Sequence, residues 1–179
     1  QITMANCNNY ISYKDIISGI DIKEADIVNV SSDILELLQV CRRSNEVFAP
    51  NIFIDSIIKK IGNNGTLLFP SYNWGFCKGE TFDYRNTLSL TGALSNVALK
   101  RKDFKRTKHP FFSFTVWGRD QEYLCNLDNK SAFGADSPFS YFYEKKAKNL
   151  FIGVDYKHAL TFDHYIEEKV GVEYRFFKD

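Results

Sequence analysis

The sequence predicts an α/β domain, and three observations carry that prediction. A strand pattern, a helix pattern and a second strand pattern follow one another within the first seventy residues, which is the order of a βαβ unit. Further helix and strand patterns alternate from there to residue 171. No Pro- or Gly-rich linker interrupts the series, so the chain of 179 residues is expected to form a single domain, residues 1–179.

The first half of the chain carries the βαβ unit. Residues 27–30 are almost entirely apolar and lead into a polar turn, as expected of a buried strand. Residues 51–62 have apolar side chains at helical spacing, and the last of them is a glycine, which is typical of a helix end. Residues 66–69 follow a turn, and Pro70 is expected to end this second strand.

The second half repeats the alternation. A helix is expected over residues 89–101, where the apolar residues share one side, and a strand over residues 111–118. Residues 137–147 look helical, with Pro138 in the first turn, where proline is tolerated. Residues 149–154 form another apolar strand.

A last helix is expected over residues 160–171. Thr161 is a plausible N-cap, Asp163 falls in the first turn, and Gly171 is suited to the C-cap. The helix carries His164 and Glu167, which at i and i+3 share one face. A carboxylate beside an imidazole fixes its tautomer and suits it to accept a proton near neutral pH. Taken alone, the motif is short, and most such pairs belong to the solvated side of a surface helix.

Composition excludes several classes of function. The formal net charge is only +1, so neither a nucleic-acid nor a membrane-surface partner is expected. No apolar run approaches the ~20 residues that span a bilayer, and the first residues lack a signal-peptide pattern, so the expected location is cytoplasmic. The four cysteines lie far apart without CxxC spacing, and no histidine pair has metal-ligand spacing. No metal site is therefore expected.

Other polar residues admit two interpretations each. His109 follows a run of basic residues, which could meet a phosphorylated cofactor or form an ordinary solvated loop. Asp83 could bind a cationic substrate or cap a turn. The turn before Ser137 could bind an anion at a helix start, although most such turns only reverse the chain. His158 has no partner nearby in the sequence and is expected to be structural or exposed.

The order of the motifs is more specific than any one of them. Six segments follow in series: GTLLFPS, FDYRNTLSLTGAL, RTKHPFFSFTVWG, FGADSP, LFIGV and TFDHYIEEKVGVEYR. This series resembles the aminoglycoside 3-N-acetyltransferase family over residues 26–175. The resemblance implies a three-layer α/β/α fold with a mixed central sheet, distinct from the commoner acetyltransferase superfamily. It also implies acetyl transfer from acetyl-coenzyme A, without a metal, to a primary amine of an aminoglycoside or amino sugar.

The resemblance also implies roles for single residues. His164 and Glu167 match the family's catalytic HxxE motif. Asp83 is a candidate contact of the acceptor for a separate reason, because an aminosugar is cationic and needs a carboxylate partner. Six residues match segments that face coenzyme A: Ser31, Ser32, Ser71, Thr107, His109 and Ser113. Glu168 is expected to be a solvated neighbour of the pair.

The sequence also departs from the family pattern. The histidine of the family's V-H-S-S turn is absent, and Leu88 stands where the family has proline. Family members typically continue beyond the point where this chain ends, so we expect it to lack the family's C-terminal segment. The expected partner is a small-molecule amine acceptor, and a homodimer is the expected assembly. The alternative hypothesis is a non-catalytic or truncated relative that binds coenzyme A or a sugar in a surface-polysaccharide pathway.

Overall fold

A computed structural model of the chain describes residues 10–174 and shows a mixed sheet of five strands. The strand order is β3-β4-β2-β1-β5. The strands are β1 (Ile27–Ser32), β2 (Thr66–Pro70), β3 (Lys105–Arg106), β4 (Phe114–Gly118) and β5 (Lys148–Ile152). β1 is parallel to both β2 and β5, whereas β4 is antiparallel to β2 and to β3. The expected βαβ unit is confirmed, because β1 and β2 are parallel neighbours.

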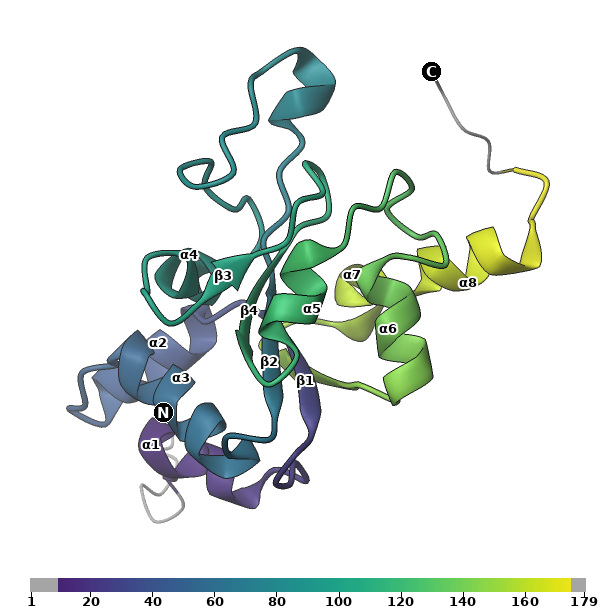
Figure 1. The fold of residues 1–179 in the computed structure, drawn as a ribbon. Coiled ribbons are helices and arrows are strands. Elements are labelled where there is room, and N and C mark those ends of the chain that lie inside the picture. The colour runs from purple at the N-terminus through teal and green to yellow at the C-terminus, as the bar shows by residue number, and fades with distance from the viewer. Residues whose placement is uncertain (1–9, 175–179) are drawn as a thin grey trace.

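Helices cover both faces of this sheet, which gives the expected three layers (Figure 1). On one side lie α1 (Tyr13–Ile16), η2 (Ile17–Gly19), α2 (Leu35–Arg43), α3 (Pro50–Ile61) and α4 (Ala93–Leu99). On the other side lie α5 (Gln121–Asn126), α6 (Pro138–Lys145) and α8 (Asp163–Val170). Two short helices lie in loops near the strand ends, η3 (Gly75–Lys78) and α7 (Tyr156–Ala159).

Alternate residues of the strands supply two separate cores. Val28 and Val30 of β1 point to the face covered by α3 and α4, where Leu67 and Phe69 of β2 also lie. The intervening positions point to the opposite face and pack against α5, α6 and α8; Leu68 is one of them, and it is fully buried. Both faces are therefore apolar, as expected of strands buried within α/β layers.

The strands and longer helices that the sequence predicts are present, with small shifts of their ends. α4 begins at Ala93, four residues later than expected, and β4 begins at Phe114, three later. Thr161 is not the N-cap of α8, because the helix begins at Asp163 after Phe162 and has no side-chain cap. Gly171 does end α8 in the left-handed conformation.

The sequence patterns did not indicate α1, α2, α5 or α7. Three of these have six residues or fewer, which is shorter than a periodicity window can detect. α2 is longer, but Leu35, Leu38 and Val40 on it are exposed, so its apolar residues do not form one buried stripe. Cys7 and Arg175, the last residue of the motif series, lie outside the described residues.

One glycine determines how the chain leaves β5. Gly153 has a φ of +62°, and a Cβ there would lie 2.2 Å from the carbonyl oxygen of Asp33. A hydrogen bond joins the segments after β1 and β5 at this point, because the Asp33 amide donates to the Ile152 carbonyl over 2.8 Å. This tight turn directs α7 and α8 over the carboxyl ends of β1 and β2.

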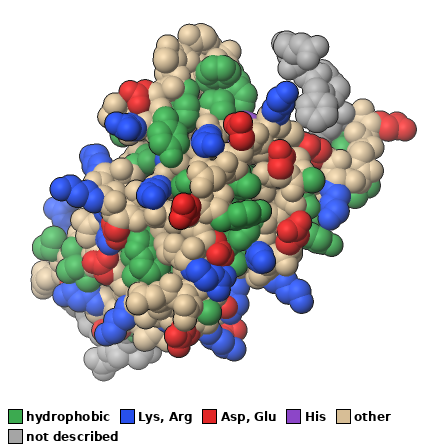
Figure 2. All heavy atoms as spheres, in the orientation of Figure 1, with side chains coloured by type: hydrophobic (Ala, Val, Ile, Leu, Met, Phe, Trp, Pro, Cys, Tyr) green, Lys and Arg blue, Asp and Glu red, His purple; other side chains and the backbone are tan. Residues whose placement is uncertain are grey.

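Charged side chains of both signs are interspersed over the face shown in Figure 2. Hydrophobic side chains gather at the top of that view, over the loop that carries η3. This loop exposes Trp74, Phe76, Leu88 and Leu90. Between residues 10 and 174, no helix is both long and apolar enough to cross a membrane.

Candidate active site

A cavity of about 430 Å³ opens at the carboxyl ends of the parallel strands. The ends of β1 and β2 form its floor, and the segment from β5 through α7 to the start of α8 forms its roof. β1 lies between β2 and β5, so the cavity sits where the connections diverge to opposite sides of one strand. This is the usual place for a ligand site in an open α/β sheet.

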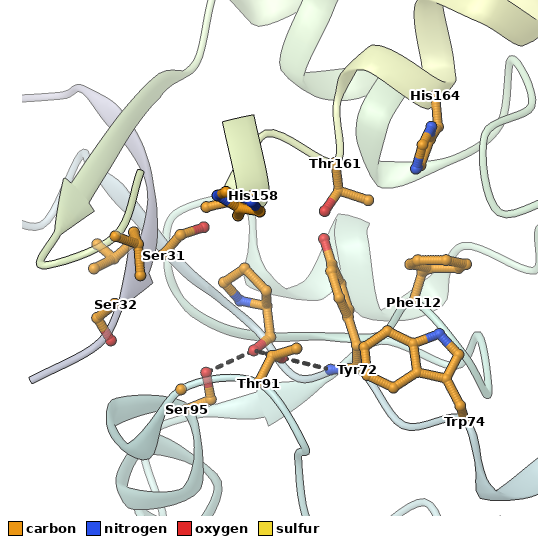
Figure 3. A pocket seen from close by; sticks show the side chains of 15 residues that line it. Ser31, Ser32, Tyr72, Trp74, Thr91, Ser95, Phe112, His158, Thr161 and His164 are labelled. Carbon is orange, nitrogen blue, oxygen red and sulfur yellow. Dashed lines mark hydrogen bonds between the residues drawn. The ribbon is translucent and has the colours of Figure 1, made fainter. Parts of the chain in front are cut away.

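His164 and Glu167 meet at the edge of this cavity. His164 Nδ1 lies 3.1 Å from Glu167 Oε2, so the expected contact across one helix turn is confirmed. The His164 ring points from α8 toward the cavity, as Figure 3 shows. The other carboxylate oxygen of Glu167 accepts a hydrogen bond from the Tyr174 hydroxyl over 3.0 Å. Glu167 is thereby held on both sides, and its position fixes the orientation of the imidazole.

A row of aromatic rings runs beneath and beside His164. We call Trp74, Tyr72, Phe112 and Phe133 the aromatic row. Tyr72 contacts Trp74 and Phe112 in edge-to-face geometry, with centroid distances of 6.5 and 5.0 Å. Phe112 lies 4.9 Å from Phe133, whose ring meets that of His164 edge-on at 5.5 Å. The imidazole is therefore positioned by packing as well as by its carboxylate partner.

Tyr72 links the aromatic row to the roof of the cavity. Its hydroxyl points toward the Thr161 side chain in Figure 3. Burial raises the pKa of Tyr72 well above its usual range, so the phenol keeps its proton at neutral pH. Thr161 thus lines the cavity instead of capping α8, while its carbonyl accepts from the His164 amide.

The other end of the cavity is lined by hydroxyl groups and a second histidine. Ser31 and Ser32 lie at the end of β1, with His158 of α7 above them (Figure 3). Gly92 also lines this end with a φ of +72°, and a Cβ there would lie 3.2 Å from the Ser32 carbonyl oxygen. Of the six serine, threonine and histidine residues matched to coenzyme A segments, only Ser31 and Ser32 line the cavity.

Three of the remaining four are buried and bind the protein itself. Ser113 donates from its hydroxyl to the Ser71 carbonyl over 2.8 Å, and the Ser71 amide donates to the Ser113 carbonyl over 2.8 Å. The Ser71 and Thr115 hydroxyls lie 2.6 Å apart. Thr107 accepts from the Phe114 amide over 2.9 Å. These bonds join the end of β2 to the chain entering β4, and so they hold the cavity wall.

Arg106 completes this wall from β3. Its guanidinium donates to the Ser113 hydroxyl at 2.9 Å, to the Ser71 carbonyl at 2.8 Å and to the Thr87 carbonyl at 2.5 Å. It also lies 4.8 Å from the centroid of the Phe82 ring. Burial lowers its pKa to about 10, so it remains charged at neutral pH. The basic run before His109 therefore includes a buried structural cation.

His109 is the fourth of these residues, and it is also buried. Its Nδ1 accepts hydrogen bonds from the amides of Phe111 and Phe112, each over 3.2 Å. These bonds shape the turn that presents Phe112 to the cavity. Burial lowers the pKa of His109 below its usual value, and a hydrogen bond to the Lys130 backbone acts in the opposite direction.

The lowered pKa of His109 predicts a pH-dependent stability. Below the usual histidine pKa of 6.5 the unfolded chain binds the proton more readily than the folded chain, so acidification favours unfolding. The contribution of His109 to the free energy of unfolding should be fully present above pH 6.5. It should decrease as the pH falls from there toward the lowered pKa of His109 in the folded chain. His109→Asn keeps an acceptor near Nδ1 but cannot titrate. Urea unfolding of both proteins between neutral and mildly acidic pH should show a flatter dependence for the variant; equal slopes would contradict the prediction.

Two carboxylates have roles other than lining the cavity. Asp83 accepts hydrogen bonds from the amides of Arg85 and Asn86 at 2.8 and 3.0 Å, so it stabilises a turn. Its predicted contact with an acceptor stays a prediction. Glu168 is not merely solvated, because it accepts from the Ser131 hydroxyl at 2.8 and 2.9 Å. That bond ties α8 to the segment before α6.

The Ser137 hydroxyl serves the start of α6 itself. Its hydroxyl accepts from the Ser140 amide and caps α6, with Pro138 in the first turn as expected. Within residues 10–174, no group of three or more histidine, cysteine, aspartate or glutamate side chains is arranged to hold a metal ion.

A family model for aminoglycoside 3-N-acetyltransferase matches residues 30–179, which is most of the chain. The chain belongs to the aminoglycoside 3-N-acetyltransferase family. The members of this family are acyltransferases, and the expected resemblance is confirmed. Among curated proteins, none matches the chain.

Solved structures of this family share the fold. One is "AAC-IIIb binary with CoASH", with a TM-score of 0.72 and 17% identity over 88% of this chain and 63% of that one. Another is sisomicin-bound AAC-VIa, with a TM-score of 0.71 and 20% identity over 89% of this chain and 65% of that one. The YokD protein from Bacillus subtilis has a TM-score of 0.69 and 18% identity over 81% and 64%. The chain thus spans less than two thirds of each structure.

Most of the cavity lining could not be found from local motifs. Tyr72, Trp74 and Phe112 are aromatic residues in a sequence rich in them, so nothing in their spacing distinguishes them. His158 is exposed, as expected, but it also lines the cavity. The one available signal was position, since Tyr72 and Trp74 directly follow a strand whose carboxyl end should face a ligand.

Proposed function

We propose that this chain carries the acetyl-transfer site of an N-acetyltransferase that uses acetyl-coenzyme A. The acceptor is a primary amine of an aminoglycoside or amino sugar. The observation that carries the proposal is the His164 imidazole, which faces the cavity and is held by Glu167 at 3.1 Å. Acetyl-coenzyme A is a cytoplasmic metabolite, so the proposed location is the cytoplasm.

His164 acts as the general base. Glu167 accepts the hydrogen bond of Nδ1–H, which makes Nε2 the basic nitrogen of the ring. As the neutral amine attacks the thioester carbonyl, His164 removes a proton from the nitrogen. Collapse of the tetrahedral intermediate breaks the carbon–sulfur bond, and the same proton leaves with the thiol. The products are an N-acetyl amide and free coenzyme A, and the balanced reaction includes neither a metal ion nor an oxidant.

The described residues also suit the acyl donor. Ser31 and Ser32 offer hydroxyl groups to the amides of a pantetheine arm, and Gly92 keeps the space beside Ser32 open. The Tyr72 phenol is a hydrogen-bond donor on the cavity surface, which supports assigning it to the carbonyl oxygen as negative charge develops.

Thiol release separates this proposal from a binding module. The purified chain is incubated with acetyl-coenzyme A and a panel of aminoglycosides and amino sugars, and free thiol is measured with a chromogenic disulfide. Amine-dependent release, with an acetylated product of the expected mass, is the predicted result. Binding of acetyl-coenzyme A without release by any amine would support the non-catalytic alternative instead.

A further inference from the structure

Two of the three histidines in the chain line the same cavity. His164 lies at the end beside the aromatic row, and His158 lies at the end formed by Ser31 and Ser32. In the view of Figure 3 the Tyr72 hydroxyl lies between the two imidazoles. His164 and Tyr72 have roles in the proposed mechanism, whereas His158 has none.

His158 has a carboxylate partner of its own. Its Nδ1 lies 4.0 Å from Asp155 Oδ2, across the same three-residue spacing that joins His164 to Glu167. Asp155 is fixed in turn, because its side chain caps α7 and accepts from the Lys157 amide over 3.0 Å. In a protonated imidazole both ring nitrogens donate, so Nδ1–H can face Asp155 while Nε2–H faces the cavity.

The order of groups along the cavity indicates where the sulfur of a thioester would lie. With the amine at His164 and the carbonyl oxygen at Tyr72, the third substituent of the carbonyl carbon extends toward Ser31 and Ser32. That substituent is the sulfur with its pantetheine arm, and His158 lies on its side of the cavity. Negative charge develops on the sulfur as the carbon–sulfur bond breaks, because an alkyl thiol is a weak acid with a pKa near the ~8.5 of cysteine. A protonated imidazole beside a thiolate stabilises this charge.

Resting on the proposed function, we propose that His158 is a second catalytic residue, which stabilises the leaving thiolate of the acyl donor. Its Nε2–H donates a hydrogen bond to the sulfur as the carbon–sulfur bond breaks, and Asp155 holds the ring through Nδ1. The carbon–nitrogen bond forms nearer His164, which takes the proton of the amine. His158 transfers no proton of its own, so the proton of the amine still leaves with the thiol. The ligand class is an acyl thioester of an alkyl thiol, bound with its sulfur beside α7.

Two acetyl donors with different thiols test this role. Acetyl-coenzyme A releases an alkyl thiol, whereas S-acetyl thionitrobenzoate releases an aryl thiol, which is a much stronger acid. The amine is the one that gives the fastest thiol release with the unmodified chain. His158→Ala should lower kcat with acetyl-coenzyme A roughly tenfold, the effect of losing one hydrogen bond to a charged group. With the aryl donor the loss should stay below about twofold, because a more acidic thiol leaves without help.

Two further variants provide matched comparisons. His158→Gln keeps a side-chain N–H donor and should retain a large part of kcat with acetyl-coenzyme A. His164→Ala should slow both donors alike, because the base acts on the amine and not on the sulfur. The His158 side chain is 84% exposed, so its variants should leave the midpoint of urea unfolding nearly unchanged. Equal losses in His158→Ala and His158→Gln would overturn the role even where the aryl thioester does not react.

The outcomes separate this inference from the proposed function. Normal kcat of His158→Ala with acetyl-coenzyme A, or an equal loss with both donors, would overturn the role of His158 and leave the proposed function intact. A raised KM for acetyl-coenzyme A at unchanged kcat would show a binding contact only, and it would also overturn the inference. Absence of thiol release from the unmodified chain with every amine would contradict both proposals.

Discussion

His164→Ala is expected to reduce kcat for acetyl transfer by about a hundredfold or more, which corresponds to ~2.7 kcal/mol of transition-state stabilisation. The amine must lose a proton during attack, and the imidazole that accepts it would be missing. KM should change much less, because the ring contacts the reacting amine rather than the body of either substrate. Steady-state thiol-release kinetics measure both constants.

Two acidic residues on the same helix turn provide a matched comparison. Glu167 holds His164 at 3.1 Å, whereas Glu168 binds Ser131. Glu167→Gln should lower kcat about tenfold with little change in KM, because the tautomer and orientation of the base are no longer fixed. Glu168→Gln should retain nearly full kcat.

Chemical rescue separates catalysis from folding. In His164→Gly, added imidazole should restore part of the lost rate, since the small base can enter the space left by the side chain. Near-normal turnover by folded His164→Ala would exclude this residue as the base. Absence of rescue together with equal losses in the Glu167 and Glu168 variants would assign α8 a purely structural role.

Arg106→Met is expected to lower the free energy of unfolding by about 3 kcal/mol. Arg106 is only 3% exposed, and its donors satisfy the backbone carbonyls of Ser71 and Thr87. A buried ion pair can be replaced by apolar residues without loss when both partners are removed. Here the acceptors are main-chain atoms that no side-chain substitution removes. The Thr87 carbonyl would lose its Arg106 donor, and the Ser71 carbonyl would keep only the Ser113 hydroxyl.

Arg101→Met is the matched control for the loss of an arginine. Arg101 pairs with Asp55 and Asp103, whose side chains are 58% and 43% exposed. Water can replace those contacts, so the loss should stay within about 1 kcal/mol. Urea unfolding gives the free energy for both variants. Equal losses would show that the Arg106 contacts contribute no more than a surface ion pair.

The Arg106 variant also has a functional consequence. The wall that Arg106 joins includes Ser71 and Ser113, which are the chain neighbours of Tyr72 and Phe112. Loosening it should displace the aromatic row, so the folded fraction of Arg106→Met should show a raised KM for the acceptor. This effect on KM is distinct from the effect on kcat expected at His164.

Features carried by neighbouring residues were predictable from the sequence. Gly171 ends α8 through its own backbone freedom, and α3 ends at Ile61 just before Gly62. The contact between His164 and Glu167 follows from helix geometry, because residues three apart lie on one face. The parallel pairing of β1 and β2 follows from the order of the patterns between residues 27 and 69.

Other features needed the tertiary structure, because they depend on segments far apart in the chain. Whether a serine faces a cavity or the interior depends on strand register and packing, and so Ser31 lines the cavity while Ser113 binds Ser71. His158 reaches the same cavity only because the turn at Gly153 directs the chain back over β1.

The sequence by itself determined the family, the succession of β1, α3 and β2, and the His164–Glu167 pair, since each depends on residue type and short spacing. Only the tertiary structure decided that His164 of this pair faces a cavity lined by Trp74 and Phe112. Burial and the meeting of distant segments are properties of the folded chain, and local patterns do not encode which faces meet.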